Sequence, residues 1–96
     1  MPHISVLYPE EDRQIAQIPE TGLLIGRSSF CDLCLKDEFV SANHCRISLE
    51  NEVFFLEDLG STNGTFINGE QIDRKSPLEA GQNVQVGVTV FSILPP

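Results

Sequence analysis

Two Asn-Gly pairs lie in the stretch Ser61-Thr62-Asn63-Gly64-Thr65-Phe66-Ile67-Asn68-Gly69-Glu70-Gln71-Ile72. Asn-Gly is a strong hairpin signal because both residues tolerate the positive φ that tight two-residue turns require. The second pair separates residues 65–67 from residues 70–72, which predicts two short antiparallel strands. This stretch therefore indicates a fold built from β-hairpins.

The rest of the chain shows the same organisation. Short apolar or alternating segments are bounded by Gly, Pro and acidic turns, and none shows a helical period of 3.6 residues. The sequence therefore predicts an all-β sandwich or barrel, as a single domain over residues 1–96 that is either complete or a module of a longer chain. The expected strands, besides 65–67 and 70–72, are 4–8, 14–18, 23–25, 34–35, 44–50, 53–56, 83–86 and 88–94.

Two details of this pattern can be tested directly. Residues 73–81, which contain Pro77 and Gly81, are predicted to form a loop. In the strand 44–50, alternation places Cys45, Ile47 and Leu49 on the core face. The same alternation places His44 on the opposite, polar face, with Arg46 and Ser48.

Composition limits the classes of function. The formal net charge of the 96 residues is -8, and the six basic residues form no stripe, so we expect no binding to nucleic acid. The N-terminal segment does not resemble a signal peptide, and no apolar segment is long enough to cross a bilayer. These features predict a protein of the cytoplasm, or of the nucleus if it is eukaryotic, with no membrane partner.

The three cysteines are expected to be free thiols, because their number is odd and a secretion signal is lacking. Cys31 and Cys34 have C-x-x-C spacing, but no second pair accompanies them, so neither a metal site nor a cofactor is predicted. Cys45 alternates with apolar residues and is predicted to lie in the core.

Three clusters suit the binding of a phosphate group. They are Gly26-Arg27, Ser41-Ala42-Asn43-His44 and residues 61–65. A phosphomonoester has close to two negative charges and three acceptor oxygens, which match a guanidinium group, hydroxyls and backbone N–H groups on loops. Simpler alternatives are a surface ion pair for Arg27, a turn cap for Ser41, and a purely turn-forming role for Thr62 and Asn63.

Taken in order, these residues resemble the forkhead-associated (FHA) domain. The resemblance runs from Leu23 to Ile93 and rests on an ordered set of short motifs: Ile25-Gly26-Arg27, Cys31-Asp32-Leu33, Ser41-x-x-His44, residues 58–65, Asn68-Gly69, and Leu78-x-x-Gly81 followed by Val84 and Gly87. It implies an eleven-stranded β-sandwich of the FHA type. It also implies a non-catalytic module whose loops at one end bind phosphothreonine peptides.

The resemblance also implies a role for each site residue. Arg27, Ser41 and Thr62 would contact the phosphate, and Asn63 would hydrogen-bond the peptide backbone. Gly26, His44 and Gly64 would be architectural. The expected partner is a phosphothreonine protein, either a Ser/Thr kinase or a substrate of one.

Three residues bear on how well this site would work. Ala42 occupies a position where the family often has a polar or basic residue, which removes one contact to the ligand. The acidic pair Asp37-Glu38 would disfavour a dianion nearby. Phe39, two residues before Ser41, is either tucked against the core edge or part of an apolar surface for a ligand residue C-terminal to the phosphothreonine.

Two other classes of function compete with phosphopeptide recognition as interpretations of the sequence. A phosphate-independent structural or assembly module is the alternative, which Ala42 and the acidic charge favour. An enzyme is not expected, because no nucleophile, base or carboxylate pair has a recognisable catalytic spacing.

Overall fold

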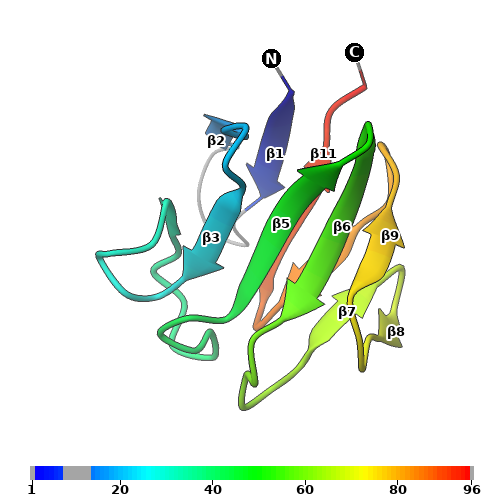
Figure 1. Ribbon diagram of the computed structural model, residues 1–96. Coiled ribbons are helices and arrows are strands. Elements are labelled where there is room, and N and C mark those ends of the chain that lie inside the picture. Colours follow the sequence, from blue (N-terminus) through cyan, green and yellow to red (C-terminus); the bar gives the residue numbers. More distant parts are fainter. Residues whose placement is uncertain (1, 8–13, 96) are drawn as a thin grey trace.

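Two β-sheets packed face to face form the whole of the described structure (Figure 1). The computed structural model describes residues 2–7 and 14–95, and all eleven of its elements are strands. They are β1 (His3–Leu7), β2 (Gln14–Gln17), β3 (Leu23–Gly26), β4 (Leu33–Cys34), β5 (Cys45–Glu50), β6 (Val53–Asp58), β7 (Thr65–Ile67), β8 (Glu70–Gln71), β9 (Ser76–Leu78), β10 (Val84–Val86) and β11 (Thr89–Ile93). The all-β, eleven-stranded sandwich is therefore confirmed.

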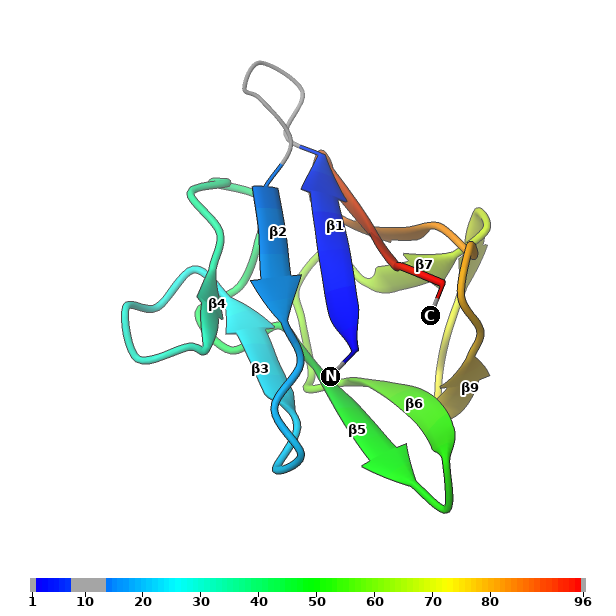
Figure 2. The same cartoon turned by 90° about the horizontal axis from the view of Figure 1, so that it is seen from above.

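One sheet has the strand order β2-β1-β11-β10-β7-β8, and the other has the order β4-β3-β5-β6-β9. Within these sheets every pair is antiparallel except β3 with β4. Both termini lie at one end of the sandwich, close to the tip of the β5–β6 hairpin (Figure 2). The loops after β3, β4 and β6 lie at the other end.

The core lies between the sheets and follows the alternation of each strand. Ile4 and Phe91 face inwards from the six-stranded sheet, while Ile25, Ile47 and Leu56 face them from the other sheet, each 1% exposed or less. Cys45 is fully buried among them, as its alternation predicts. The apolar inward positions of both sheets thus supply the burial that stabilises the sandwich.

Hairpin turns follow the expected chemistry in part. Asn68 and Gly69 have φ values of 48° and 85°, as a tight turn between β7 and β8 requires. Asn51 and Glu52 also have positive φ and close the β5–β6 hairpin. The pair Asn63-Gly64 differs, since only Gly64 has positive φ, and it belongs to the longer β6–β7 loop.

The structure corrects three predictions about the strands. Residues 73–81 are not only a loop, because Ser76–Leu78 forms β9, in which Pro77 pairs with Phe55. Proline is compatible with this strand because β9 lies at the sheet edge.

Leu49 is 36% exposed rather than in the core, because it lies near the end of β5. Strand ends also differ from the prediction by a residue or two, since β4 begins at Leu33 rather than at residue 34. The predicted end of the first strand, Tyr8, lies outside the described residues.

Candidate functional site

Backbone hydrogen bonds connect the loop after β3 to the loop between β4 and β5. The N–H of Arg27 donates to the Ser41 carbonyl over 2.9 Å, and the N–H of Ser28 donates to the Ala42 carbonyl over 3.1 Å. The approach is so close that a Cβ on Gly26 would lie 2.2 Å from the Ala42 oxygen. Only glycine fits at position 26, and Arg27 is thereby held directly beside Ser41.

Ser41 also contacts the third loop, between β6 and β7. Its Oγ accepts a hydrogen bond from the Thr62 N–H over 3.0 Å. Because the hydroxyl oxygen is the acceptor in this bond, the hydroxyl proton is left to donate to a ligand. Thr62 itself is exposed. Arg27, Ser41 and Thr62 therefore form one connected patch.

Asn63 connects the same two loops one residue further along. Its Nδ2 donates to the Phe39 carbonyl over 2.8 Å. This is the one hydrogen bond of the Asn63 side chain within residues 2–7 and 14–95, and it uses one of the two amide protons. The amide oxygen and the second proton are therefore left for the backbone of an extended ligand.

His44 is fully buried between these loops, directly before β5. Its Nδ1 accepts a hydrogen bond from the Ser41 N–H over 3.0 Å, and its Nε2 lies 2.8 Å from the Gly64 carbonyl oxygen. An acceptor at Nδ1 and a carbonyl opposite Nε2 assign the neutral ring with its proton on Nε2. The prediction that His44 lies on a polar strand face is wrong, because the ring is inserted between the loops.

Asp58, at the end of β6, organises the β6–β7 loop. Its carboxylate accepts from the backbone N–H groups of Gly60 and Ser61, each over 3.1 Å, and from the hydroxyls of Ser61 and Thr65 over 2.5 and 2.7 Å. Burial raises the pKa of Asp58, but these hydrogen bonds outweigh it and hold the pKa below its usual value. The sequence signal for this role is an Asp followed by Gly-Ser, the pattern of an Asx turn.

Asp37 has a similar role in the β4–β5 loop. It is 6% exposed and accepts hydrogen bonds from the N–H groups of Phe39 and Val88, each over 2.9 Å, and from the Thr89 hydroxyl over 2.8 Å. Burial raises the pKa of Asp37, but these bonds together lower it below its usual value. Asp37 is therefore a structural carboxylate that keeps its negative charge, whereas Glu38 is exposed. That this acidic pair disfavours a dianion nearby stays a prediction.

These two carboxylates predict how stability depends on pH. Because the folded-state pKa is lowered for both, their contribution is fully present above the unfolded value of about 3.9 and is lost as the pH falls through the folded value. We expect urea unfolding to show a steep loss of stability below about pH 4. Asp37→Asn should already be less stable at pH 7 and should show a shallower dependence on pH. A pH dependence equal to that of the wild type would contradict this.

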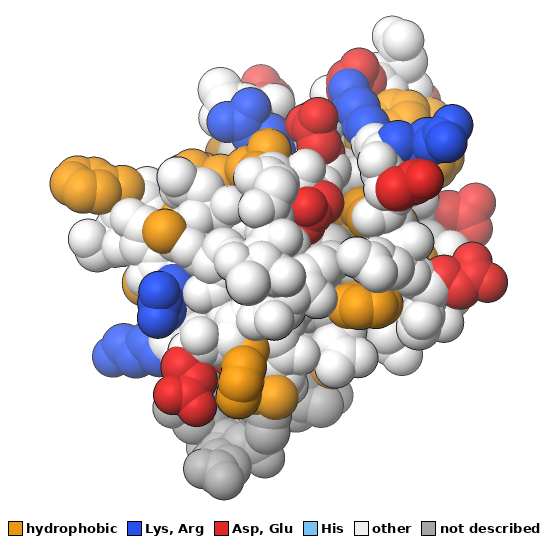
Figure 3. Space-filling view, turned by 90° about the horizontal axis from the view of Figure 1, so that it is seen from below, with side chains coloured by type: hydrophobic (Ala, Val, Ile, Leu, Met, Phe, Trp, Pro, Cys, Tyr) orange, Lys and Arg blue, Asp and Glu red, His pale blue; other side chains and the backbone are white. Residues whose placement is uncertain are grey.

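Arg27 is exposed at the loop end. The ion pairs found among residues 2–7 and 14–95 join Arg74 to Asp73 and Lys75 to Glu50, so the alternative of a surface pair for Arg27 is not realised there. Viewed onto this end, backbone and uncharged polar side chains fill the middle of the surface, and charged side chains lie around them (Figure 3). Arg27 is thus an exposed cation in the loop after β3, without an ion pair to the described residues.

The cysteines contribute to the architecture. Cys31 is buried, and its Sγ donates to the Ala42 carbonyl over 3.1 Å, on the loop that carries Ser41. Cys34 is exposed in β4. Burial raises the pKa of the Cys31 and Cys45 thiols. Within the described part of the chain, no group of three or more His, Cys, Asp or Glu side chains is arranged to hold a metal.

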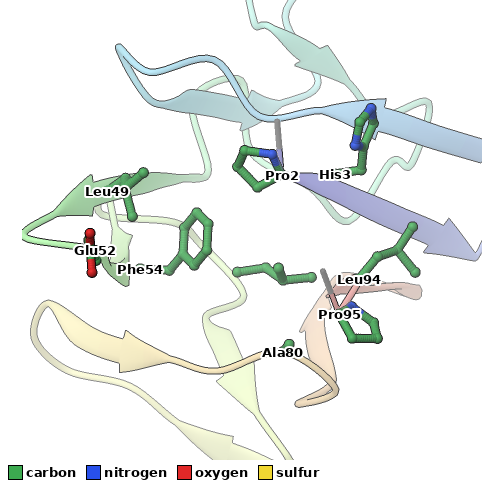
Figure 4. A pocket seen from close by; sticks show the side chains of 9 residues that line it. Pro2, His3, Leu49, Glu52, Phe54, Ala80, Leu94 and Pro95 are labelled. Atoms are coloured by element: carbon green, nitrogen blue, oxygen red, sulfur yellow. The ribbon is translucent and has the colours of Figure 1, made fainter.

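An apolar cavity lies at the opposite end of the sandwich, near the termini (Figure 4). It has a volume of about 700 Å³, and Leu49, Phe54 and Leu94 are among its lining residues. None of the predicted site residues lines it, so this cavity and the connected patch are separate features. In the ranges 2–7 and 14–95 we find no helix of the length and hydropathy needed to cross a membrane.

A comparison of the sequence with models of protein families agrees with this geometry. The model of the FHA domain matches residues 23–87, and these residues include all three clusters, so the chain belongs to the FHA family. FHA domains are interaction modules.

Curated relatives include FhaB of Mycobacterium tuberculosis, which is 33% identical over 78 residues. That alignment covers 81% of this chain and 50% of FhaB, so the chain spans about half the length of this relative. The glycogen accumulation regulator GarA of the same species is 42% identical over 62 residues, which cover 65% of this chain and 38% of GarA.

Solved structures show the same sandwich. The FHA domain of the CT664 protein from Chlamydia trachomatis is 28% identical with a TM-score of 0.90, and the match covers 99% of this chain and 97% of that one. A domain from a study of phosphothreonine-dependent FHA domain interactions is 26% identical with a TM-score of 0.86, over 98% of this chain and 97% of that one.

Proposed function

We propose that this chain is a phosphothreonine-dependent peptide recognition module that binds its ligand at the loop end of the sandwich. One observation carries the proposal: Ser41 connects all three clusters. Its carbonyl accepts from the Arg27 N–H and its Oγ accepts from the Thr62 N–H. Arg27 and two hydroxyl-bearing residues are thereby held on adjoining loops, and a guanidinium group with two hydroxyls suits a dianion with three acceptor oxygens.

The roles within this patch follow from the contacts. Arg27 supplies the positive charge and a bidentate fork, while Ser41 and Thr62 each donate a hydroxyl proton to a phosphate oxygen. Asn63 is held through the Phe39 carbonyl, so its free amide atoms pair with the peptide backbone on either side of the phosphothreonine. Gly26, His44 and Gly64 hold the three loops in this arrangement.

Phe39 belongs to the ligand surface in this proposal. It is 49% exposed, and its carbonyl accepts from Asn63, the residue that reads the peptide backbone. Its ring therefore lies where a residue next to the phosphothreonine, on the Asn63 side of the site, can pack against it.

Ala42 sets the expected strength of binding. Its carbonyl is occupied by the Ser28 N–H and the Cys31 Sγ, and its methyl group has no hydrogen-bonding atom. The lost contact is worth roughly 1.5–3 kcal/mol, so the affinity is reduced without being abolished.

The biological setting follows from the chemistry of the ligand. The partner is a Ser/Thr kinase or a protein that such a kinase phosphorylates, and the module acts in signal transduction, in the cytoplasm or in the nucleus. One comparison supports a phosphorylated partner, because a similar structure comes from work on phosphothreonine-dependent FHA domain interactions. A second supports a protein partner, because the FHA domain of FhaA was solved in complex with the intracellular domain of Rv3910.

The decisive experiment compares matched peptides that have phosphothreonine, phosphoserine or unmodified threonine at one position. We expect calorimetric titration to detect binding of the phosphothreonine peptides only, with phosphoserine at least about tenfold weaker because it lacks the γ-methyl group. A cellular partner should be lost after phosphatase treatment. A partner that binds equally before and after treatment would instead support the phosphate-independent assembly module.

A further inference from the structure

Phe30 is the most exposed large hydrophobic side chain in the described part of the chain. Its exposed fraction is 92%, against 63% for Ile15 and 50% for Val88. It lies in the loop between β3 and β4, three residues after Arg27. A single exposed hydrophobic residue needs no explanation by itself, so the inference depends on how this loop is held and on what lies beside it.

The turn that presents Phe30 is fixed by four hydrogen bonds. The Phe30 N–H donates to Ser28 Oγ over 3.1 Å, and the Cys31 N–H donates to the Ser28 carbonyl over 3.0 Å. The Ser28 N–H and Cys31 Sγ, each over 3.1 Å, also donate to the Ala42 carbonyl of the neighbouring loop. The ring is therefore held out from the surface by a defined turn, and little backbone entropy would be lost when it binds a partner.

Phe30 is also within reach of a ligand at the patch. Three residues span at most about 11 Å, so the Cα atom of Phe30 lies no further than this from that of Arg27. An extended peptide rises about 3.3 Å per residue. A peptide whose phosphate is bound by Arg27 therefore has a side chain beside Phe30 after about two to four residues.

We propose that Phe30 is a specificity-determining residue that packs against an apolar side chain of the phosphopeptide, two to four positions from the phosphothreonine, on the Arg27 side of the site. This inference rests on the proposed function. Phe39, on the loop between β4 and β5, is a separate aromatic residue of the proposed ligand surface. Aromatic rings are favoured anchors in interfaces because they offer a large contact area with few rotatable bonds. The net charge of -8 further disfavours acidic residues in this part of the ligand.

An array of phosphothreonine peptides tests the proposal. In this array, each of the four positions before and after the phosphothreonine is varied among Leu, Phe, Ala, Ser and Asp. Four proteins are compared: the wild type, Phe30→Ser, Phe39→Ala, and Val53→Ser as a control. Val53 is 44% exposed at the tip of the β5–β6 hairpin, at the other end of the sandwich. Thermal unfolding confirms that each variant is folded.

We expect the wild type to favour Leu or Phe over Ser by about five- to tenfold at one position two to four residues from the phosphothreonine. Phe30→Ser should lose this preference and keep its affinity for the peptide with Ser at that position. Val53→Ser should keep the preference, and Phe39→Ala should keep it too, because Phe39 lies on a different loop.

Two results would overturn the inference, and they are distinguishable. If Phe30→Ser keeps the complete pattern of preferences while phosphothreonine is still required, Phe30 does not contact the ligand and the proposed function stands. If the wild type binds phosphorylated and unmodified peptides equally, the proposed function fails, and the role of Phe30 in phosphopeptide selection fails with it.

Discussion

Arg27→Ala should reduce affinity for a phosphothreonine peptide by about 100-fold or more, and it should leave the fold intact. A guanidinium fork makes up to two charge-assisted hydrogen bonds to a phosphate, each worth roughly 1.5–3 kcal/mol, and a 100-fold loss corresponds to about 2.7 kcal/mol. Because the Arg27 side chain is exposed and forms no ion pair with the described residues, its removal leaves no buried partner unsatisfied. Calorimetric titration and thermal unfolding measure the two effects.

The matched control for this substitution is Arg46→Ala. Arg46 is also an exposed arginine, but it lies within β5, opposite Glu57 in the register of the β5–β6 strand pair. It is not part of the loop patch. Both variants change the net charge by the same amount, so a general effect of charge would weaken binding equally in both. Wild-type affinity in Arg27→Ala, or an equal loss in Arg46→Ala, would rule out a specific phosphate contact by Arg27.

Gly26→Ala should destabilise the protein by about 3 kcal/mol or more. The new Cβ would lie 2.2 Å from the Ala42 oxygen, 2.8 Å from the Ala42 carbonyl carbon and 2.9 Å from Cys31 Sγ. Two of these atoms are backbone, so the β4–β5 loop would have to move as a whole. We expect the melting temperature to fall by more than about 10 °C and binding to weaken, because Ser41 belongs to the displaced loop.

Gly60→Ala is the control that separates crowding from backbone conformation. Gly60 has a φ of 79°, yet a Cβ there would meet no atom within 4 Å. Its substitution should cost only about 1 kcal/mol, the usual cost of a positive φ for alanine. If the two variants were equally stable, close packing at Gly26 would not be what holds the loops together.

Hairpin chemistry and alternation predicted most of the fold. Asn68-Gly69 predicted the β7–β8 turn correctly because a two-residue turn is a local property of the chain. Strand β9 was missed because Pro77 normally excludes a strand, and only its place at a sheet edge, which depends on the complete topology, makes proline compatible. His44 was assigned to a polar face because strand alternation cannot show that the β6–β7 loop covers the start of β5.

The site was predictable as a set of residue types but not as a connected structure. The sequence places Arg27, Ser41 and Thr62 on three loops, whereas the hydrogen bonds that join them are tertiary contacts between residues 14 and 21 positions apart. The structural role of Asp37 was not predictable for the same reason, since its donors Val88 and Thr89 lie 51 and 52 residues away. The sequence gives no signal for Phe30, because an exposed and a buried phenylalanine look alike there.

The family match and the folding unit do not have the same limits. The FHA model covers residues 23–87, yet β11 lies between β1 and β10 in the six-stranded sheet, and β1 and β11 supply Ile4, Val6, Phe91 and Ile93 to the core. A protein trimmed to residues 23–87 would leave β10 as an unprotected edge and would open the core to water, which favours aggregation. The three loops of the connected patch therefore depend, for a closed core and protected sheet edges, on two segments that contain none of the motifs.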